Sequence, residues 1–104
     1  MVRRNLKGME TVIIKNLGKY SGEEVKINGW VYNTRSVGKI WFLILRDGSG
    51  LLQCVVVNGE CDSESFNLEQ NLNQEDSVII TGFVKKEPRA AGGFELSVKT
   101  ISIV

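Results

Sequence analysis

Four side chains in this sequence have the chemistry to recognise the bases of single-stranded RNA. Arg35, Phe42 and Gln53 lie within residues 29–57, and Glu95 lies closer to the end of the chain. Proteins that recognise unpaired RNA bases stack aromatic rings on them and hydrogen-bond to their edges. Phe42 would supply the stacking, and the other three side chains would supply hydrogen bonds. This chemistry requires one sheet face that carries all four groups.

The composition argues against a catalytic site within the chain. The 104 residues make one domain, and they include no histidine, which is the commonest general base and metal ligand. The sequence has no nucleophile motif and no pair of catalytic carboxylates, and we predict no metal site and no cofactor for this chain. Cys54 lies in an apolar run, which predicts a core residue. Cys61 lies in a polar stretch and could be a free, exposed thiol.

Charge and cysteine usage limit the partners and the location. The formal net charge of +1 gives no general attraction for polyanions, so any binding to nucleic acid must come from a local patch. Two cysteines without a signal peptide suggest a reducing, cytoplasmic setting, and no apolar run approaches the length of a membrane span. The candidates for phosphate contacts are Lys39, Lys85, Lys86 and Arg89.

The order of apolar runs and turn residues predicts an all-β domain with a small α content. Five strands are expected, over residues 23–35, 40–46, 51–57, 77–86 and 94–104. Asp62 or Ser63 could cap a short helix between the third and fourth strands, with Phe66, Leu68 and Leu72 as its apolar residues. This order is that of the OB-fold, a five-stranded Greek-key barrel that commonly binds oligonucleotides or oligosaccharides. The residues predicted to fill the core are Val25, Ile27, Leu43, Leu45, Leu52, Val56, Leu96 and Val98.

Alternation along these strands predicts which candidates point outward. Phe42 lies on the opposite strand face from Trp41 and Leu43. Gln53 is the only polar residue of its strand, and an inward amide would need buried partners, so we expect it to point outward. Glu95 alternates with apolar neighbours and is also expected outward.

Arg35 has two interpretations. Strict alternation places it on the same face as Val25 and Val31, which are predicted to point inward. Either a β-bulge at Gly29 reverses the alternation, or Arg35 lies beyond the end of its strand.

Each candidate also has a purely structural interpretation. Phe42 could belong to the core, because most phenylalanines in apolar strands do. Gln53 could cap the end of the barrel, and Glu95 could pair with Lys99. The basic residues near the end of the fourth strand could form an ordinary solvated edge.

The sequence resembles the N-terminal anticodon-binding domain of class IIb aminoacyl-tRNA synthetases over nearly all of residues 11–104. The matching pieces fall in the order of that family: GWV at residues 29–31, Arg35, the Gly38-Lys39 turn, Phe42-Leu43, LRDGSG at residues 45–50, and Gln53. RAAGGFEL, at residues 89–96, resembles the loop before the last strand and the start of that strand. These segments are most similar to the asparaginyl branch.

The resemblance implies a role for each candidate. Phe42 would stack on the central uridine of the anticodon, and Gln53 would hydrogen-bond to it. Glu95 would contact anticodon bases, and Arg35 would lie near the anticodon. The implied partner is the anticodon stem-loop of a tRNA. The aspartyl branch also recognises a central uridine and stays an alternative, as does a nonspecific single-stranded nucleic-acid-binding OB domain. The latter would usually have a more basic groove and several stacking aromatic rings.

The family enzyme joins asparagine to its tRNA with ATP and Mg²⁺, in a catalytic domain that this chain lacks. The resemblance implies that this domain follows in the full-length protein and that the protein is a homodimer. Within the chain, residues 1–10 are predicted to be a flexible basic leader and residues 11–104 the OB-fold domain. At its start, Ile13, Ile14, Leu17 and Tyr20 are expected to pack a short lead-in against the barrel.

Overall fold

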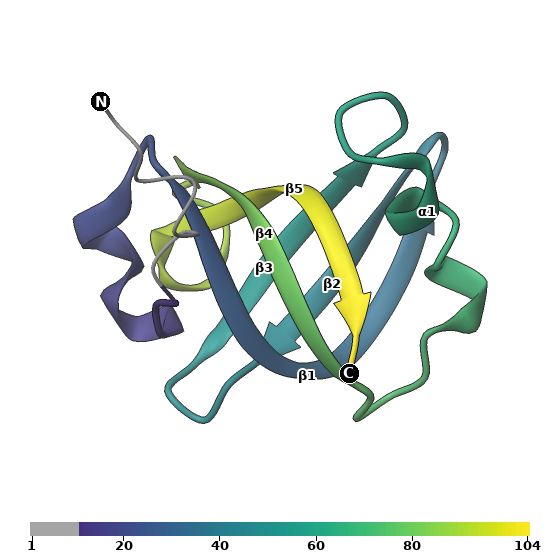
Figure 1. Ribbon diagram of the computed structural model, residues 1–104. Coiled ribbons are helices and arrows are strands. Elements are labelled where there is room, and N and C mark those ends of the chain that lie inside the picture. Colours follow the sequence, from purple (N-terminus) through teal and green to yellow (C-terminus); the bar gives the residue numbers. More distant parts are fainter. Residues whose placement is uncertain (1–10) are drawn as a thin grey trace, which may run out of the picture.

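The computed structural model describes residues 11–104, so the predicted leader over residues 1–10 lies outside the described part. A closed β-barrel with strand order β1-β2-β3-β5-β4 makes up most of it (Figure 1). β3 and β5 pair in parallel, and the other four pairings are antiparallel. This architecture confirms the predicted OB-fold barrel. The strands are β1 (Glu24–Val37), β2 (Ile40–Arg46), β3 (Leu51–Val57), β4 (Ser77–Lys86) and β5 (Phe94–Ile103).

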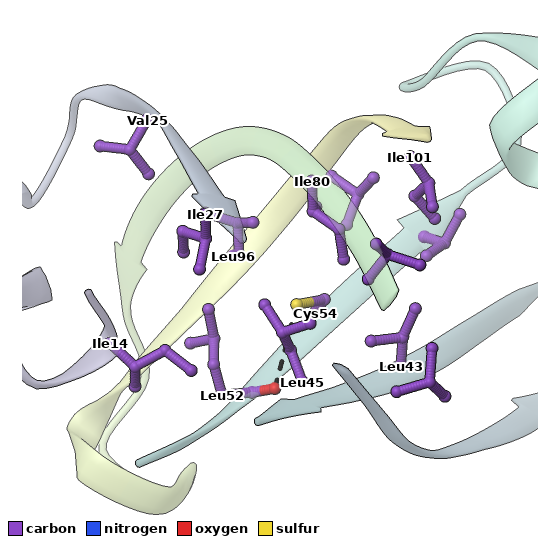
Figure 2. Close-up of a cluster of buried hydrophobic side chains, with 14 of the residues drawn as sticks. Ile14, Val25, Ile27, Leu43, Leu45, Leu52, Cys54, Ile80, Leu96 and Ile101 are labelled. Atoms are coloured by element: carbon purple, nitrogen blue, oxygen red, sulfur yellow. Dashed lines mark hydrogen bonds between the residues drawn. The ribbon is translucent and has the colours of Figure 1, made fainter. Parts of the chain in front are cut away.

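The inward-facing side chains of all five strands fill the barrel. β2 and β3 alternate between buried and partly exposed positions along their whole length. Cys54 is fully buried among leucine and isoleucine side chains (Figure 2), as its apolar strand predicted. All eight predicted core residues are buried: Val25, Ile27, Leu43, Leu45, Leu52, Val56, Leu96 and Val98.

β1 is long because it pairs with two different strands. Its first half pairs with β4 and its second half pairs with β2, so β1 closes the barrel. The bulge predicted at Gly29 is instead found at Tyr32, where the β1–β2 register shifts between Val31 and Asn33. Gly29 serves a different purpose: a Cβ atom at this position would lie 2.6 Å from the carbonyl oxygen of Arg46. A glycine therefore lets two backbones approach closely where β1 passes from one partner to the other.

The helix between β3 and β4 begins as predicted and is shorter than its apolar residues suggested. It is α1 (Ser63–Phe66), and the Asp62 side chain accepts a hydrogen bond from the Ser65 backbone N–H at 2.8 Å. A separate 3₁₀ turn, η2 (Glu69–Asn71), follows it. Trp41 fixes α1 on the barrel, because its indole Nε1 donates to the Phe66 carbonyl oxygen at 2.9 Å.

A 3₁₀ helix, η1 (Ile14–Tyr20), packs against the opposite end of the barrel from α1 (Figure 1). Ile14 and Leu17 are buried and Tyr20 is partly buried against the core, as predicted. Ile13 is exposed, so its predicted packing is wrong: it precedes η1 and faces solvent.

The β2–β3 turn holds η1 in place through one carboxylate. Asp47 Oδ2 accepts from the backbone N–H of Ile14 at 2.8 Å, and Asp47 Oδ1 accepts from the backbone N–H and the hydroxyl of Ser49. Burial alone would raise the pKa of Asp47. The hydrogen bonds that Asp47 accepts from Ile14, Ser49 and Gly50 outweigh burial and hold that pKa below its usual value.

Candidate nucleic-acid interface

Phe42 projects from the outer face of β2. Its neighbours Trp41 and Leu43 are fully buried, whereas Phe42 is only half-buried. The ring is therefore not a core residue, and its outward direction is the one that alternation predicted. Directly across from it lie Arg35 on β1 and Val55 on β3.

Arg35 lies on the same outer face because the bulge at Tyr32 reverses the alternation of β1. It is still within the strand, which ends at Val37, so a bulge does reverse the alternation, although at Tyr32 and not at the predicted Gly29. The guanidinium carbon lies 5.1 Å from the centroid of the Phe42 ring. This is the geometry of a cation–π contact.

Gln53 and Glu95 meet across the parallel pairing of β3 and β5. Gln53 Nε2 donates a hydrogen bond to Glu95 Oε1 at 3.1 Å, and both side chains are half-buried on the outer face. Gln53 therefore lies in the middle of the sheet and does not cap the barrel end. The alternative partner for Glu95, Lys99, instead places its ammonium over the ring of Phe83 on β4.

Gln53 and Glu95 belong to a row of paired residues that crosses all five strands. We call it the Gln53 row, and its members in spatial order are Asn33, Ile44, Gln53, Glu95 and Lys85. Phe42 comes two residues before Ile44 on β2, so its ring lies beside the row on the same face. Residues at such diagonal positions are about 7–8 Å apart, which is within reach of aromatic and long side chains. The pairing thus brings Arg35, Phe42, Gln53 and Glu95 onto one continuous surface.

The four basic candidates are all exposed but do not gather in one place. Lys39 lies in the β1–β2 turn, and Lys85 is directly paired with Glu95 at the end of the Gln53 row. Lys86 ends β4, and Arg89 follows in the next loop, with its guanidinium 3.8 Å from the Glu87 carboxylate. Lys85 is the one candidate of the four that belongs to the Gln53 row.

Sequence reasoning missed two outward residues of β1 beside this surface. Asn33 is exposed in the Gln53 row, and Tyr32 is exposed at the bulge. Asn33 stands two positions before Arg35, so it would have been assigned to the same face once the direction of Arg35 was known. The direction of Tyr32 depends on the bulge, and no residue type in β1 indicates where this bulge lies.

Metal sites, membrane-spanning helices and the two cysteine thiols of residues 11–104 give no further candidate site. Within residues 11–104, no group of three or more histidine, cysteine or acidic side chains is placed to hold a metal ion. No helix in the same range is long and apolar enough to cross a membrane. Burial, followed by the negative charge of Glu95, raises the pKa of the Cys54 thiol far above its usual value. Cys61 is only partly exposed, and its pKa is raised by burial and by Asp62 and Glu60.

Comparison with known proteins agrees with this geometry. The tRNA anti-codon family model, which describes an OB-fold nucleic acid binding domain, matches residues 25–104. The chain belongs to this family. Its match begins at the first buried residue of β1 and runs to the end of β5, so the family covers the whole barrel.

The curated relatives of this OB-fold domain include asparagine–tRNA ligases. It is 53% identical over 96 residues to an asparagine–tRNA ligase from Pelotomaculum thermopropionicum, covering 92% of the chain and 22% of the ligase. The asparaginyl-tRNA synthetase structure from Pyrococcus horikoshii matches with a TM-score of 0.82 and 36% identity, over 89% of the chain and 22% of the synthetase. An aspartyl tRNA synthetase from Entamoeba histolytica matches with a TM-score of 0.79 and 26% identity, over 99% of the chain and 23% of that protein.

These matches confirm the resemblance to the synthetase domains, and to the asparaginyl branch in particular. The chain spans about a fifth of the length of the curated relatives it matches.

Proposed function

We propose that this chain is the anticodon-binding domain of an asparaginyl-tRNA synthetase and that it recognises the central uridine of the anticodon. The observation that carries the proposal is the position of the Phe42 ring beside the hydrogen-bonded Gln53–Glu95 pair on the outer face. The asparaginyl relatives support it, because their identity to the chain is higher than that of the aspartyl structure.

Each side chain has a role that its position allows. Phe42 stacks on the central base, and Gln53 hydrogen-bonds to the edge of that base. Glu95 and Arg35 lie on either side of these two residues and complete the contacts with the anticodon. Lys85 contacts phosphate at the end of the Gln53 row, and Lys39, Lys86 and Arg89 are the more distant candidates.

The full-length protein would be an asparagine–tRNA ligase that uses ATP and Mg²⁺ in a further catalytic domain. The Pyrococcus horikoshii synthetase has also been solved in a complex with asparaginyl-adenylate, which is consistent with the use of ATP in that relative. By the same likeness, we propose that the full-length protein is a homodimer that works in the cytoplasm.

The test compares Phe42→Ala with a matched control, Phe83→Ala. Both rings are on the outer face with a cation 5.1 Å from the ring centroid, but Phe83 lies on β4, which is separated from Gln53 on β3 by β5. Phe42→Ala is expected to weaken binding to an asparagine anticodon stem-loop by about 1–3 kcal/mol. Phe83→Ala is expected to leave this affinity unchanged. Titrations with the stem-loop, with a stem-loop of scrambled loop sequence and with poly-U, all at one salt concentration, measure the difference.

Thermal melts of the same variants show whether the ring is needed for folding. Because Phe42 is only half-buried, its truncation should cost less than the roughly 3–5 kcal/mol typical of a buried phenylalanine. The proposal fails if the domain binds poly-U as tightly as the stem-loop. It also fails if Phe42→Ala melts the domain without changing its affinity for RNA.

A further inference from the structure

The hydrogen bond between Gln53 and Glu95 determines which way the Gln53 amide points. Gln53 Nε2 donates to Glu95 Oε1 at 3.1 Å. An ionised carboxylate only accepts hydrogen bonds, so an amide rotated by 180° would place its own oxygen against the carboxylate oxygen. The rotated amide would also lose a charge-assisted hydrogen bond. The oxygen of the Gln53 amide is therefore kept on the side away from Glu95.

A fixed amide distinguishes uridine from cytidine, whereas a free amide does not. At ring position 3, uridine has an N–H donor and cytidine has an acceptor. At position 4, uridine has a carbonyl acceptor and cytidine has an amino donor. A glutamine amide offers one acceptor and two donors, so it can match either base if it is free to rotate. A base that Phe42 holds in one stacked pose meets only the orientation that Glu95 permits.

We propose that Glu95 is a positioning residue that sets the preference for uridine over cytidine by fixing the Gln53 amide. This inference rests on the proposed function, because it requires a base stacked on Phe42. It assigns Glu95 a task in addition to the contact with the anticodon proposed above. The two side chains are directly paired across β3 and β5, so the backbone keeps them within reach of each other before any RNA binds.

The test is a double-mutant cycle of Gln53→Ala and Glu95→Gln, read as the ratio of affinities for stem-loops with uridine or cytidine at the centre. One well-placed pair of hydrogen bonds discriminates between bases by roughly 5- to 150-fold, which is the preference expected of the unaltered domain. Glu95→Gln can donate or accept, so it frees the Gln53 amide, and the ratio should fall toward one. The affinity for the uridine stem-loop should fall by much less than the ratio.

The matched control is Glu24→Gln, which removes the same charge from the outer face of β1, outside the Gln53 row. It corrects for the general gain in RNA affinity when a negative charge is lost, and it should leave the ratio unchanged. An NMR spectrum of the Gln53 side-chain amide gives a second measurement. Its bonded proton should shift upfield in Glu95→Gln, since the hydrogen bond to a carboxylate is lost.

The outcomes are distinct. If Glu95→Gln keeps the uridine preference, the positioning role is wrong. If Glu95→Gln lowers the ratio equally in the Gln53→Ala background, Glu95 contacts the base directly and the inference is also wrong. If the unaltered domain binds a scrambled loop as tightly as the anticodon loop, the proposed function itself fails and this inference fails with it.

Discussion

The same contact between a guanidinium and an aromatic ring occurs twice between β1 and β2. The arginine is on β1 in one contact and on β2 in the other. Arg35 on β1 lies 5.1 Å from the ring centroid of Phe42 on β2, and Arg46 on β2 lies 5.3 Å from that of Trp30 on β1. In both cases the two residues are directly paired across the strands. The difference is a third partner, because Arg46 also forms an ion pair with Glu75.

Because of this third partner, we expect the contact of Arg46 with Trp30 to be structural and the contact of Arg35 with Phe42 to break more readily. The Arg46 guanidinium is held from two sides, by the ring and by a carboxylate. Within residues 11–104, Arg35 forms neither of the two described ion pairs, and its only described side-chain contact is with Phe42. An exposed cation–π contact is worth only about 0.5–1 kcal/mol. If a base stacks on Phe42 as proposed, it has only this weak contact of Arg35 to displace, whereas Arg46 is also held by Glu75.

Trp30→Ala should produce the largest effect on stability. The side chain is 40% exposed, so its truncation should cost about 2 kcal/mol, less than for a fully buried tryptophan. Affinity for the anticodon stem-loop should not change. Urea unfolding and stem-loop titrations check the two statements. Loss of RNA affinity without loss of stability would show that Trp30 belongs to the binding face and would break the comparison.

Substitutions of Glu75 test how Arg46 is held. Glu75 has a φ of 73°, a left-handed conformation that costs a non-glycine residue of order 1 kcal/mol. Glu75→Ala loses the ion pair and keeps the strain, whereas Glu75→Gly loses the ion pair and relieves the strain. The glycine variant should therefore be the more stable of the two by about 1 kcal/mol in urea unfolding. Equal stabilities would mean that the backbone here is not strained.

Arg35→Leu should have the smallest effect on stability and a clear effect on RNA. Only the contact with the Phe42 ring is lost, so the free energy of unfolding should change by at most about 1 kcal/mol. Stem-loop affinity should fall, and its dependence on salt should become shallower because one cationic contact is gone. Lys99→Leu is the control, since Lys99 covers the Phe83 ring at the same distance. If both variants weaken RNA binding equally, Arg35 acts only through net charge.

Much of this architecture could be predicted from the sequence because alternation is a strong signal in two-sided strands. The predicted bounds of β2, β3 and β4 agree with the structure, and so does the direction of Phe42. These features depend on residue type and spacing within one strand. The cap of α1 was also predictable, because Asp62 acts on the turn that immediately follows it.

The features that were missed depend on how strands meet. The bulge lies at Tyr32 because of the register between β1 and β2, and Gly29, the residue that suggested a bulge, is needed for close approach to Arg46. The two cation–π contacts on β1 and β2, and the Gln53–Glu95 hydrogen bond, form between residues of different strands. Spacing along one strand carries no information about its neighbour's register.

The double pairing of β1 also has a consequence for synthesis of the protein. The second half of β1 can pair with β2 soon after both leave the ribosome, but the first half, apart from one bridge between Thr11 and Lys26, pairs with β4. Glu24 and the residues after it therefore wait unpaired while the chain through Phe83 is made. An unpaired strand edge with apolar side chains is a template for association between chains. The nascent chain is therefore prone to such association until β4 has been synthesised and pairs with β1, which closes the barrel.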